Sequence, residues 1–168
     1  MSVKVAGFGG CPGDSAPASP CGPRRSAAQL GRQVAESPTM RKASCSCGQL
    51  TVNVVGDPVR VSVCHCLACQ QRTGSVFGAQ ARFPTAALTI IGESREYVRV
   101  GDSGGHTHFN FCPTCGSTVF YTTAGSPEHT AIPVGAFGDP TFPAPMRSVY
   151  EDRMHSWVVL PCDIEHLP

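Results

Sequence analysis

The sequence predicts a mainly β fold, namely an open and largely antiparallel β sandwich with little helix. Apolar residues alternate with polar ones along short runs, and glycine, proline or aspartate bounds most of these runs. The composition agrees, because 18 glycines, 15 prolines and only 15% charged residues suit a loop-rich β protein better than a helical one. Closely spaced cysteines are a third feature, and metal bound to them would pin such a sandwich together.

At 168 residues the chain is long enough for one domain with an extension. Residues 1–43 mix glycine, proline, alanine and serine with scattered arginine, and we expect a disordered N-terminal extension there. Met40 directly precedes the first cysteine motif, so the true start of the protein could be Met40. A transit peptide is the alternative for a segment that contains arginine and few acids. We expect the folded domain to span residues 44–168.

The expected elements follow one another from the first cysteine motif onward. The turn signal Gly56-Asp57-Pro58 separates the first two strands and predicts a hairpin with a cysteine motif at each end. Residues Leu67–Arg72 fit a single helical turn, which Gly74 would close. The expected strands are Gln49–Val55, Val59–Val63, Val76–Phe83, Leu88–Ile91, Glu96–Val100, Thr107–Phe111, Ser117–Thr122, Thr130–Val134 and Ser156–Leu160.

Seven cysteines lie in three short motifs. One- and two-residue gaps let neighbouring thiolates face one ion, and in a chain without an export signal this spacing indicates zinc ligands rather than disulfides. The pair Cys112 and Cys115 needs two more ligands, which either the first motif or the second could supply. We favour a division into four plus three. Structural zinc would bind Cys45, Cys47, Cys112 and Cys115, and a three-thiolate site would comprise Cys64, Cys66 and Cys69.

A three-thiolate zinc site leaves the fourth position open for water or substrate. An incoming thiol would suit this soft site, and its deprotonation there would give a nucleophile able to capture an aldehyde carbonyl. Three thiolates and Zn²⁺ carry a charge of −1, which Arg72 and Arg82 could compensate. Arg72 could instead bind an anionic substrate or cap the helical turn.

A second closed site is the alternative reading of the three-thiolate group. One of three histidines, His65, His106 or His108, would then complete the coordination. His65 is more simply an outward-facing spacer between two ligands, because sharing an ion with both sequence neighbours is sterically awkward. His106 and His108 are most simply surface residues of a strand or loop.

The cysteine motifs, followed by Arg72-Thr73-Gly74-Ser75, resemble those of the glutathione-dependent formaldehyde-activating enzyme (GFA) family, whose domain also occurs in centromere protein V. The resemblance runs from about Ala43 to Leu160, and all seven cysteines stand at matching gaps. Two features depart from the family pattern: His155-Ser156-Trp157 lacks the proline that often precedes the tryptophan, and residues 1–43 have no counterpart.

The resemblance implies a β fold of zinc-ribbon character and two zinc ions per chain. It implies structural zinc at the four-cysteine set and catalytic zinc at Cys64, Cys66 and Cys69, with glutathione or another thiol as co-substrate. The implied activity is that of a carbon–sulfur lyase, which joins glutathione to formaldehyde or cleaves the product, S-hydroxymethylglutathione. No residue stands out in the sequence as the one that binds the two carboxylates of glutathione.

A non-catalytic zinc-binding domain, acting as a thiol carrier or a protein-interaction module, is the alternative function. A net charge of +1 argues against nucleic acid or an anionic membrane as partner. No apolar run approaches about 20 residues, so no membrane-spanning helix is expected. Glycine and proline interrupt the N-terminus where a secretory signal would be apolar, and we expect a cytoplasmic protein. The pattern carries no information on the oligomeric state.

Overall fold

The computed structural model describes residues 38–168. It confirms a mainly β protein with two open, largely antiparallel sheets and a single α-helix in this part of the chain. The first strand, β1, spans Met40–Ser44 and thus begins before the boundary expected at residue 44. Residues 40–43 of the segment expected to be disordered thus belong to a strand, and the start at Met40 stays a prediction. The disorder and the transit peptide predicted for residues 1–37 lie outside the described residues.

The smaller sheet has three strands in the order β1-β2-β5. Strand β2 (Thr51–Val55) lies in the middle and pairs antiparallel with β1 on one side and with β5 (Leu88–Ile91) on the other. Because both edges of β2 are occupied, it does not form the predicted hairpin with the strand that follows. The predicted hairpin is therefore wrong: the turn at residues 56–58 carries the chain from one sheet to the other.

The larger sheet has eight strands in the order β11-β10-β3-β4-β9-β8-β7-β6. Neighbours are antiparallel except around β10, which runs parallel to both β3 and β11. The strands are β3 (Arg60–Cys64), β4 (Gly78–Pro84), β6 (Arg95–Val100), β7 (His106–Phe111), β8 (Thr118–Thr123), β9 (His129–Pro133), β10 (Arg147–Val149) and β11 (Glu165–His166).

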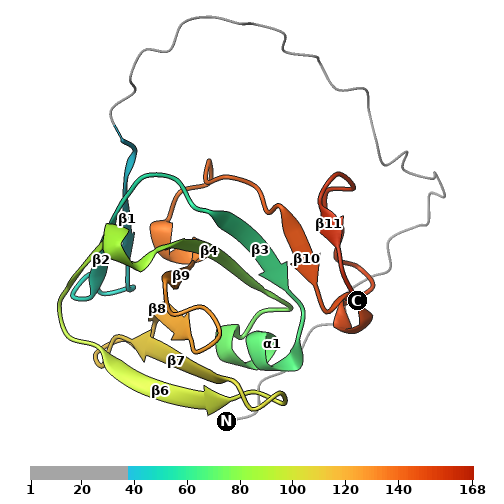
Figure 1. The fold of residues 1–168 in the computed structure, drawn as a ribbon, viewed down its shortest axis with the longest axis horizontal. Coiled ribbons are helices and arrows are strands. Elements are labelled where there is room, and N and C mark those ends of the chain that lie inside the picture. Colours follow the sequence, from blue (N-terminus) through green and yellow to red (C-terminus); the bar gives the residue numbers. More distant parts are fainter. Residues whose placement is uncertain (1–37) are drawn as a thin grey trace, which may run out of the picture. The chain divides into compact units, whose positions relative to one another are not determined.

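The helix α1 (Leu67–Thr73) follows β3 directly and ends as predicted. Gly74 adopts the left-handed conformation with φ of 64°, and its N–H donates to the carbonyl of Gln70 at 2.9 Å. In Figure 1, α1 lies between β4 and the end of the sheet formed by β6 and β7. Three short 3₁₀ helices complete the described elements: η1 (Thr85–Ala87), η2 (Val134–Phe137) and η3 (Glu151–Arg153).

The core lies between the two sheets. Val52 and Val54 of β2 pack there with Phe83 of β4 and Ile132 of β9, all fully buried. Burial of a side chain of this size contributes about 2 kcal/mol, so this apolar layer holds the sheets face to face. Within residues 38–168, no helix is long and apolar enough to cross a membrane.

One predicted strand is absent from the described structure. Residues 156–160 form a turn and irregular chain, in which the Val158 N–H donates to the His155 carbonyl at 3.0 Å. Trp157 is 68% exposed and Val159 is 89% exposed, so no buried face favours a strand there. The C-terminal part of the chain instead adds β10 and β11 to the edge of the larger sheet beside β3.

Strands β3 and β4 separate the core from the opposite face of the larger sheet. Val61 of β3 and both Ala81 and Phe83 of β4 point into the core. The alternate residues point the other way, and the register pairs Arg60 with Arg82, Ser62 with Gln80, and Cys64 with Gly78. Because residues from β10 and from β6 line one cavity on this side, the sheet curves around it.

Candidate metal centres and the adjoining cavity

The structure gathers the seven clustered cysteines into the same two groups that the spacing predicts. The first consists of Cys45, Cys47, Cys112 and Cys115, whose sulfur atoms all lie within 4.8 Å of one another. Two of these cysteines follow β1 in the smaller sheet, and the other two lie between β7 and β8 of the larger sheet. This four-cysteine group therefore joins the two sheets.

The sulfur geometry of the four-cysteine group fits tetrahedral zinc. The sulfurs of Cys45 and Cys47 are 3.5 Å apart, and those of Cys47 and Cys112 are 3.6 Å apart. A zinc–sulfur bond of about 2.3 Å in a tetrahedron requires sulfurs about 3.8 Å apart. The backbone N–H of Leu50 donates to the Cys45 sulfur at 3.3 Å, and the Gln49 side-chain amide donates to Cys112 at 3.2 Å. Such donors stabilise thiolate ligands and fix their orientation.

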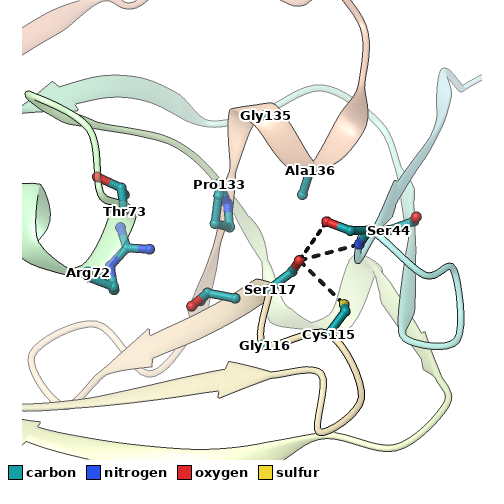
Figure 2. A pocket seen from close by; sticks show the side chains of 11 residues that line it. Ser44, Arg72, Thr73, Cys115, Gly116, Ser117, Pro133, Gly135 and Ala136 are labelled. Atoms are coloured by element: carbon teal, nitrogen blue, oxygen red, sulfur yellow. Dashed lines mark hydrogen bonds between the residues drawn. The ribbon is translucent and has the colours of Figure 1, made fainter. Parts of the chain in front are cut away.

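Ser117 links the two halves of the four-cysteine group (Figure 2). Its hydroxyl lies 3.5 Å from the Cys115 sulfur and 2.9 Å from the Ser46 hydroxyl, and it accepts from the Ser46 N–H at 3.4 Å. Hydrogen bonds with the hydroxyl and the backbone N–H of Ser117 lower the pKa of Cys115 to about 5. This cysteine is therefore ready to bind a metal as thiolate at neutral pH.

The second group consists of Cys64, Cys66 and Cys69, with sulfurs again within 4.8 Å of one another. Cys64 ends β3, Cys66 is the N-cap of α1, and Cys69 lies in the first turn of the helix. The Cys66 sulfur accepts from the Cys69 N–H at 3.4 Å, so the cap that starts the helix also aligns two of the thiols.

The residue opposite Cys64 is a glycine, which allows the helix to lie against the sheet. A Cβ atom at Gly78 would lie 3.3 Å from the Cβ of Cys69 and 3.2 Å from Nη2 of Arg72. These distances are tighter than ordinary contacts, so a side chain at this position would require Cys69 and Arg72 to shift by a few tenths of an ångström. Gly78 thus keeps the three-cysteine group compact.

Cys64 and Cys69 differ in how readily they lose a proton. A hydrogen bond from the Cys64 thiol lowers the pKa of Cys69 to about 6, and Cys66 and the nearby charge of Arg72 act in the same direction. The pKa of Cys64 is raised, because its thiol donates that hydrogen bond and is buried. Cys69 thus favours the thiolate at neutral pH, and a zinc ion would displace the protons that remain on the group.

The histidines considered as a fourth ligand do not join the three-cysteine group. Within the described residues, that group contains Cys64, Cys66 and Cys69 alone. His65 is fully buried and packs edge-on against Phe77 with 5.8 Å between ring centroids, so the expectation of an outward-facing spacer is wrong. The backbone N–H of His65 donates to the Val149 carbonyl at 3.0 Å, which extends the contact of β3 with β10. His108 instead lies 3.3 Å from Glu96 on the neighbouring strand.

A cavity of about 310 Å³ opens beside the three-cysteine group, and all three cysteines line it. Arg72 and Tyr121 form part of its wall. The Arg72 guanidinium lies 5.1 Å from the ring centroid of Phe109 and 5.4 Å from that of Tyr121, so cation–π contacts hold it in place. A separate pocket of about 440 Å³ lies on another side of Arg72, toward Ser44 and Cys115 (Figure 2), but no thiol of the three-cysteine group lines it.

Tyr121 was not predicted as a site residue. It is 6% exposed, and burial raises the pKa of its hydroxyl to about 12. Its hydroxyl therefore stays protonated at neutral pH beside Cys64, Cys69 and Arg72. Sequence reasoning placed Tyr121 only within a strand, and nothing local distinguishes it from a core aromatic residue.

Arg60 and Gln80 were also missed, and both line the same cavity. The signal that could have found them is the alternation along Arg60-x-Ser62-x-Cys64 and Gly78-x-Gln80-x-Arg82. Residues at every second position of a strand share a face, so each pattern puts polar groups on the side that holds Cys64. Arg82 was predicted to compensate the charge of the metal site, and it too lines the cavity.

The fold and the two cysteine groups together define a class of protein: a β sandwich joined by one thiolate group, with a second thiolate group open to a cavity. Residues 40–157 match the family described as glutathione-dependent formaldehyde-activating enzyme. The match covers more than half of the chain, so the protein belongs to the GFA family.

Two further comparisons complete the picture. A crystal structure of a Rhodobacter sphaeroides protein is similar, with 20% sequence identity and a TM-score of 0.46. The similarity covers 59% of this chain and 91% of that chain. Comparison with curated proteins gives no match.

Proposed function

We propose that the protein is a zinc-dependent carbon–sulfur lyase that joins glutathione, or another thiol, to formaldehyde and cleaves the adduct in reverse. Membership of the GFA family supports the substrates. The observation that carries the proposal is the position of Cys64, Cys66 and Cys69, which line a cavity of about 310 Å³. No fourth protein ligand joins them within residues 38–168, so this group leaves room for a substrate sulfur.

The two cysteine groups take different roles in this proposal. The group of Cys45, Cys47, Cys112 and Cys115 would hold a structural zinc ion, because its four sulfurs supply a complete coordination shell. The three-cysteine group would hold the catalytic ion. Zinc bound there supplies a site that binds a thiol and removes its proton at neutral pH.

In the proposed reaction, the thiol sulfur forms a bond to the carbonyl carbon of formaldehyde. The electron pair of the carbonyl π bond moves to its oxygen, which takes up a proton and becomes the hydroxyl of the product. In the reverse direction the hydroxyl loses its proton and an oxygen electron pair re-forms the carbonyl π bond. The carbon–sulfur bond breaks, and its electron pair leaves with the sulfur. The protein must therefore orient the thiol and stabilise negative charge on the oxygen.

Tyr121 is suited to stabilise the aldehyde oxygen. Tyr121 is buried and lines the same cavity as the three thiols, and a pKa of about 12 keeps the proton on the phenol. We assign it the role of hydrogen-bond donor to the developing oxyanion. Arg72 contributes a fixed positive charge next to Cys69, which balances the negative charge of three thiolates and Zn²⁺.

The first test is metal stoichiometry with and without glutathione, followed by the spectrum of the cobalt-substituted protein. We expect two metal ions per chain and a spectral change at one of them when glutathione is added. Two ions without a response to any thiol would favour the non-catalytic zinc-binding module. The variant Cys66→Ser should retain one ion and lose lyase activity with formaldehyde, because Cys66 is only half-buried and its replacement leaves the core intact.

The role of Tyr121 is tested separately by Tyr121→Phe. Removal of one preorganised donor typically lowers kcat by roughly 10²-fold, and thiol binding to the cobalt protein should be unchanged. Tyr97→Phe is the matched control, since Tyr97 is 59% exposed and lies outside the lining of this cavity. Equal activity of the two variants would contradict the assignment.

The cytoplasm remains the expected compartment. A reaction that consumes free thiol and requires metal-bound thiolates suits a reducing environment, in which both persist. The proposed partners are thus a small-molecule thiol and a small aldehyde.

A further inference from the structure

Arginines line the far end of the cavity, away from the three thiols, and the proposed chemistry leaves them without a role. Arg60 of β3 and Arg82 of β4 stand directly opposite each other in the antiparallel register. Both side chains line the cavity of about 310 Å³ and also a wider hollow of about 920 Å³ that adjoins it. They therefore lie between the thiol site and solvent.

These two arginines lack partners in the described part of the protein. Nε of Arg60, and Nε and Nη1 of Arg82, are buried atoms without a hydrogen-bond partner among residues 38–168. No aspartate or glutamate of the described chain lines the cavity. The nearby Arg147 differs, because its guanidinium is paired with Glu165 at 2.6 Å.

Two like charges at opposite positions of paired strands destabilise a sheet. Burial lowers the pKa of Arg60, and the positive charges of Arg82 and Arg147 lower it further. This second effect is the repulsion between Arg60 and the neighbouring arginines. Both arginines are half-buried, and their buried N–H groups are costly to leave without a partner. A bidentate carboxylate is the group that satisfies a guanidinium best. The free protein thus presents a site that an anion would complete.

The distance between the arginine pair and the thiol site suits a short peptide. Arg60 lies four positions before Cys64 on β3, which separates their Cα atoms by about 13 Å. A tripeptide extends over about 10 Å. The side chains of Arg60 and Cys64 both line the cavity, which shortens the distance that such a peptide must span. Between them, Gln80 donates from Nε2 to the Ser62 hydroxyl at 3.1 Å, while its Oε1 is buried without a partner among residues 38–168. That oxygen can accept from a ligand amide.

We propose that Arg60 and Arg82 are the specificity-determining residues of this site and bind a carboxylate of the thiol co-substrate. The co-substrate is then an anionic peptide thiol, with its sulfur at Cys64, Cys66 and Cys69 and a carboxylate at the arginine pair. The inference rests on the proposed function only for the position of the sulfur. It adds the residues that distinguish glutathione from small neutral thiols.

The first experiment measures calorimetric binding of S-methylglutathione, which keeps both carboxylates but has no free thiol. We expect the zinc-loaded wild-type protein to bind it, and the diester to bind roughly 10- to 100-fold more weakly. Arg60→Gln and Arg82→Gln should each lower the affinity for S-methylglutathione by a similar factor. Arg95→Gln is the matched control, because Arg95 is exposed and lies outside the lining of both hollows.

Binding of S-methylglutathione that is equal in the wild type and both cavity variants would overturn the inference. So would equal binding of S-methylglutathione and its diester to the wild type, a comparison that needs no variant. Removal of one of two opposed charges should leave the melting temperature unchanged or higher, so the variants are expected to fold.

A second measurement separates this inference from the proposed function. The cobalt spectrum with 2-mercaptoethanol reports thiol access to the metal without carboxylates, and it should respond equally in wild type and Arg82→Gln. A silent spectrum together with arginine-dependent binding of S-methylglutathione would refute the lyase and retain the anion site. A responsive spectrum with arginine-independent binding would retain the lyase and refute the anion site.

Discussion

The four-cysteine group should contribute more to stability than the three-cysteine group, and Cys45→Ser and Cys66→Ser compare the two. Each substitution removes one sulfur ligand with little change in volume. The four-cysteine group bridges Cys45 in the loop after β1 and Cys112 after β7, whereas the three-cysteine group spans only the end of β3 and the first turn of α1.

The magnitudes follow from the length of chain that each metal would close. Treated as a cross-link, a bridge over the 67 positions from Cys45 to Cys112 stabilises the fold by about 4 kcal/mol, and one over the five positions from Cys64 to Cys69 by about 2 kcal/mol. For a domain of this size, 1 kcal/mol corresponds to about 3 °C in melting temperature. We expect Tm to fall by roughly 12 °C in Cys45→Ser and by roughly 6 °C in Cys66→Ser.

The assay is thermal unfolding followed by circular dichroism at fixed protein and zinc concentrations, with metal content measured on the same samples. Each variant should retain one of two metal ions. An equal fall in Tm, or a larger fall in Cys66→Ser, would refute the reasoning that the four-cysteine group joins the two sheets.

Three further predictions concern single side chains. Burial raises the pKa of Tyr121 from its ordinary value near 10 to about 12, so its contribution to stability is fully present below pH 10 and is lost as the pH rises through 12. The free energy of unfolding of the wild type, measured by denaturant titration, should fall by roughly 2 kcal/mol between pH 10 and pH 12, and an equally steep fall in Tyr121→Phe would contradict the assignment. Gly92→Ala should destabilise by about 3 kcal/mol, because Gly92 has φ of 100° and its Cβ would lie 1.9 Å from the Gln49 carbonyl oxygen. Gly135→Ala is its control in the same denaturant titration, since a Cβ there meets no atom within 4 Å, and a similar loss in both variants would be inconsistent with this account. Gln49→Glu replaces a donor to the Cys112 sulfur by a carboxylate and should lower zinc affinity of the four-cysteine group by roughly 10- to 100-fold in chelator competition, without changing the other site; equal losses at both sites would argue against it.

Local patterns predicted much of the secondary structure. The strand Leu88–Ile91 has the predicted bounds, and Gly74 ends α1 as expected, because both depend on signals within a few residues. The grouping of the cysteines also followed from short gaps and from the number of ligands that zinc requires. The fold brings together the same four and the same three sulfurs.

Features that depend on pairing between distant segments were not predictable in this way. The turn at residues 56–58 marks a reversal but carries no information on which strand occupies the edge of β2. That edge belongs to β1, which begins within the segment assigned to the extension. The pairing of Arg60 with Arg82 likewise depends on the register of two strands, and a shift by one residue would turn every side chain to the opposite face. His65 was misjudged for a related reason, since contacts with Val149 and Phe77 bury it.

Under the proposed function, the paired strands β3 and β4 would set the length of the thiol that the site accepts. Their face opposite the core carries one pair at Cys64 and Gly78, a second at Ser62 and Gln80, and a third at Arg60 and Arg82. Successive pairs are about 7 Å apart along the strands. A positive charge moved from the third pair to the second would therefore select a thiol about 7 Å shorter, and the metal ligands would be unchanged. Intermediate lengths are not available, because the odd positions face the core. Preference among thiols would therefore change in discrete steps of length.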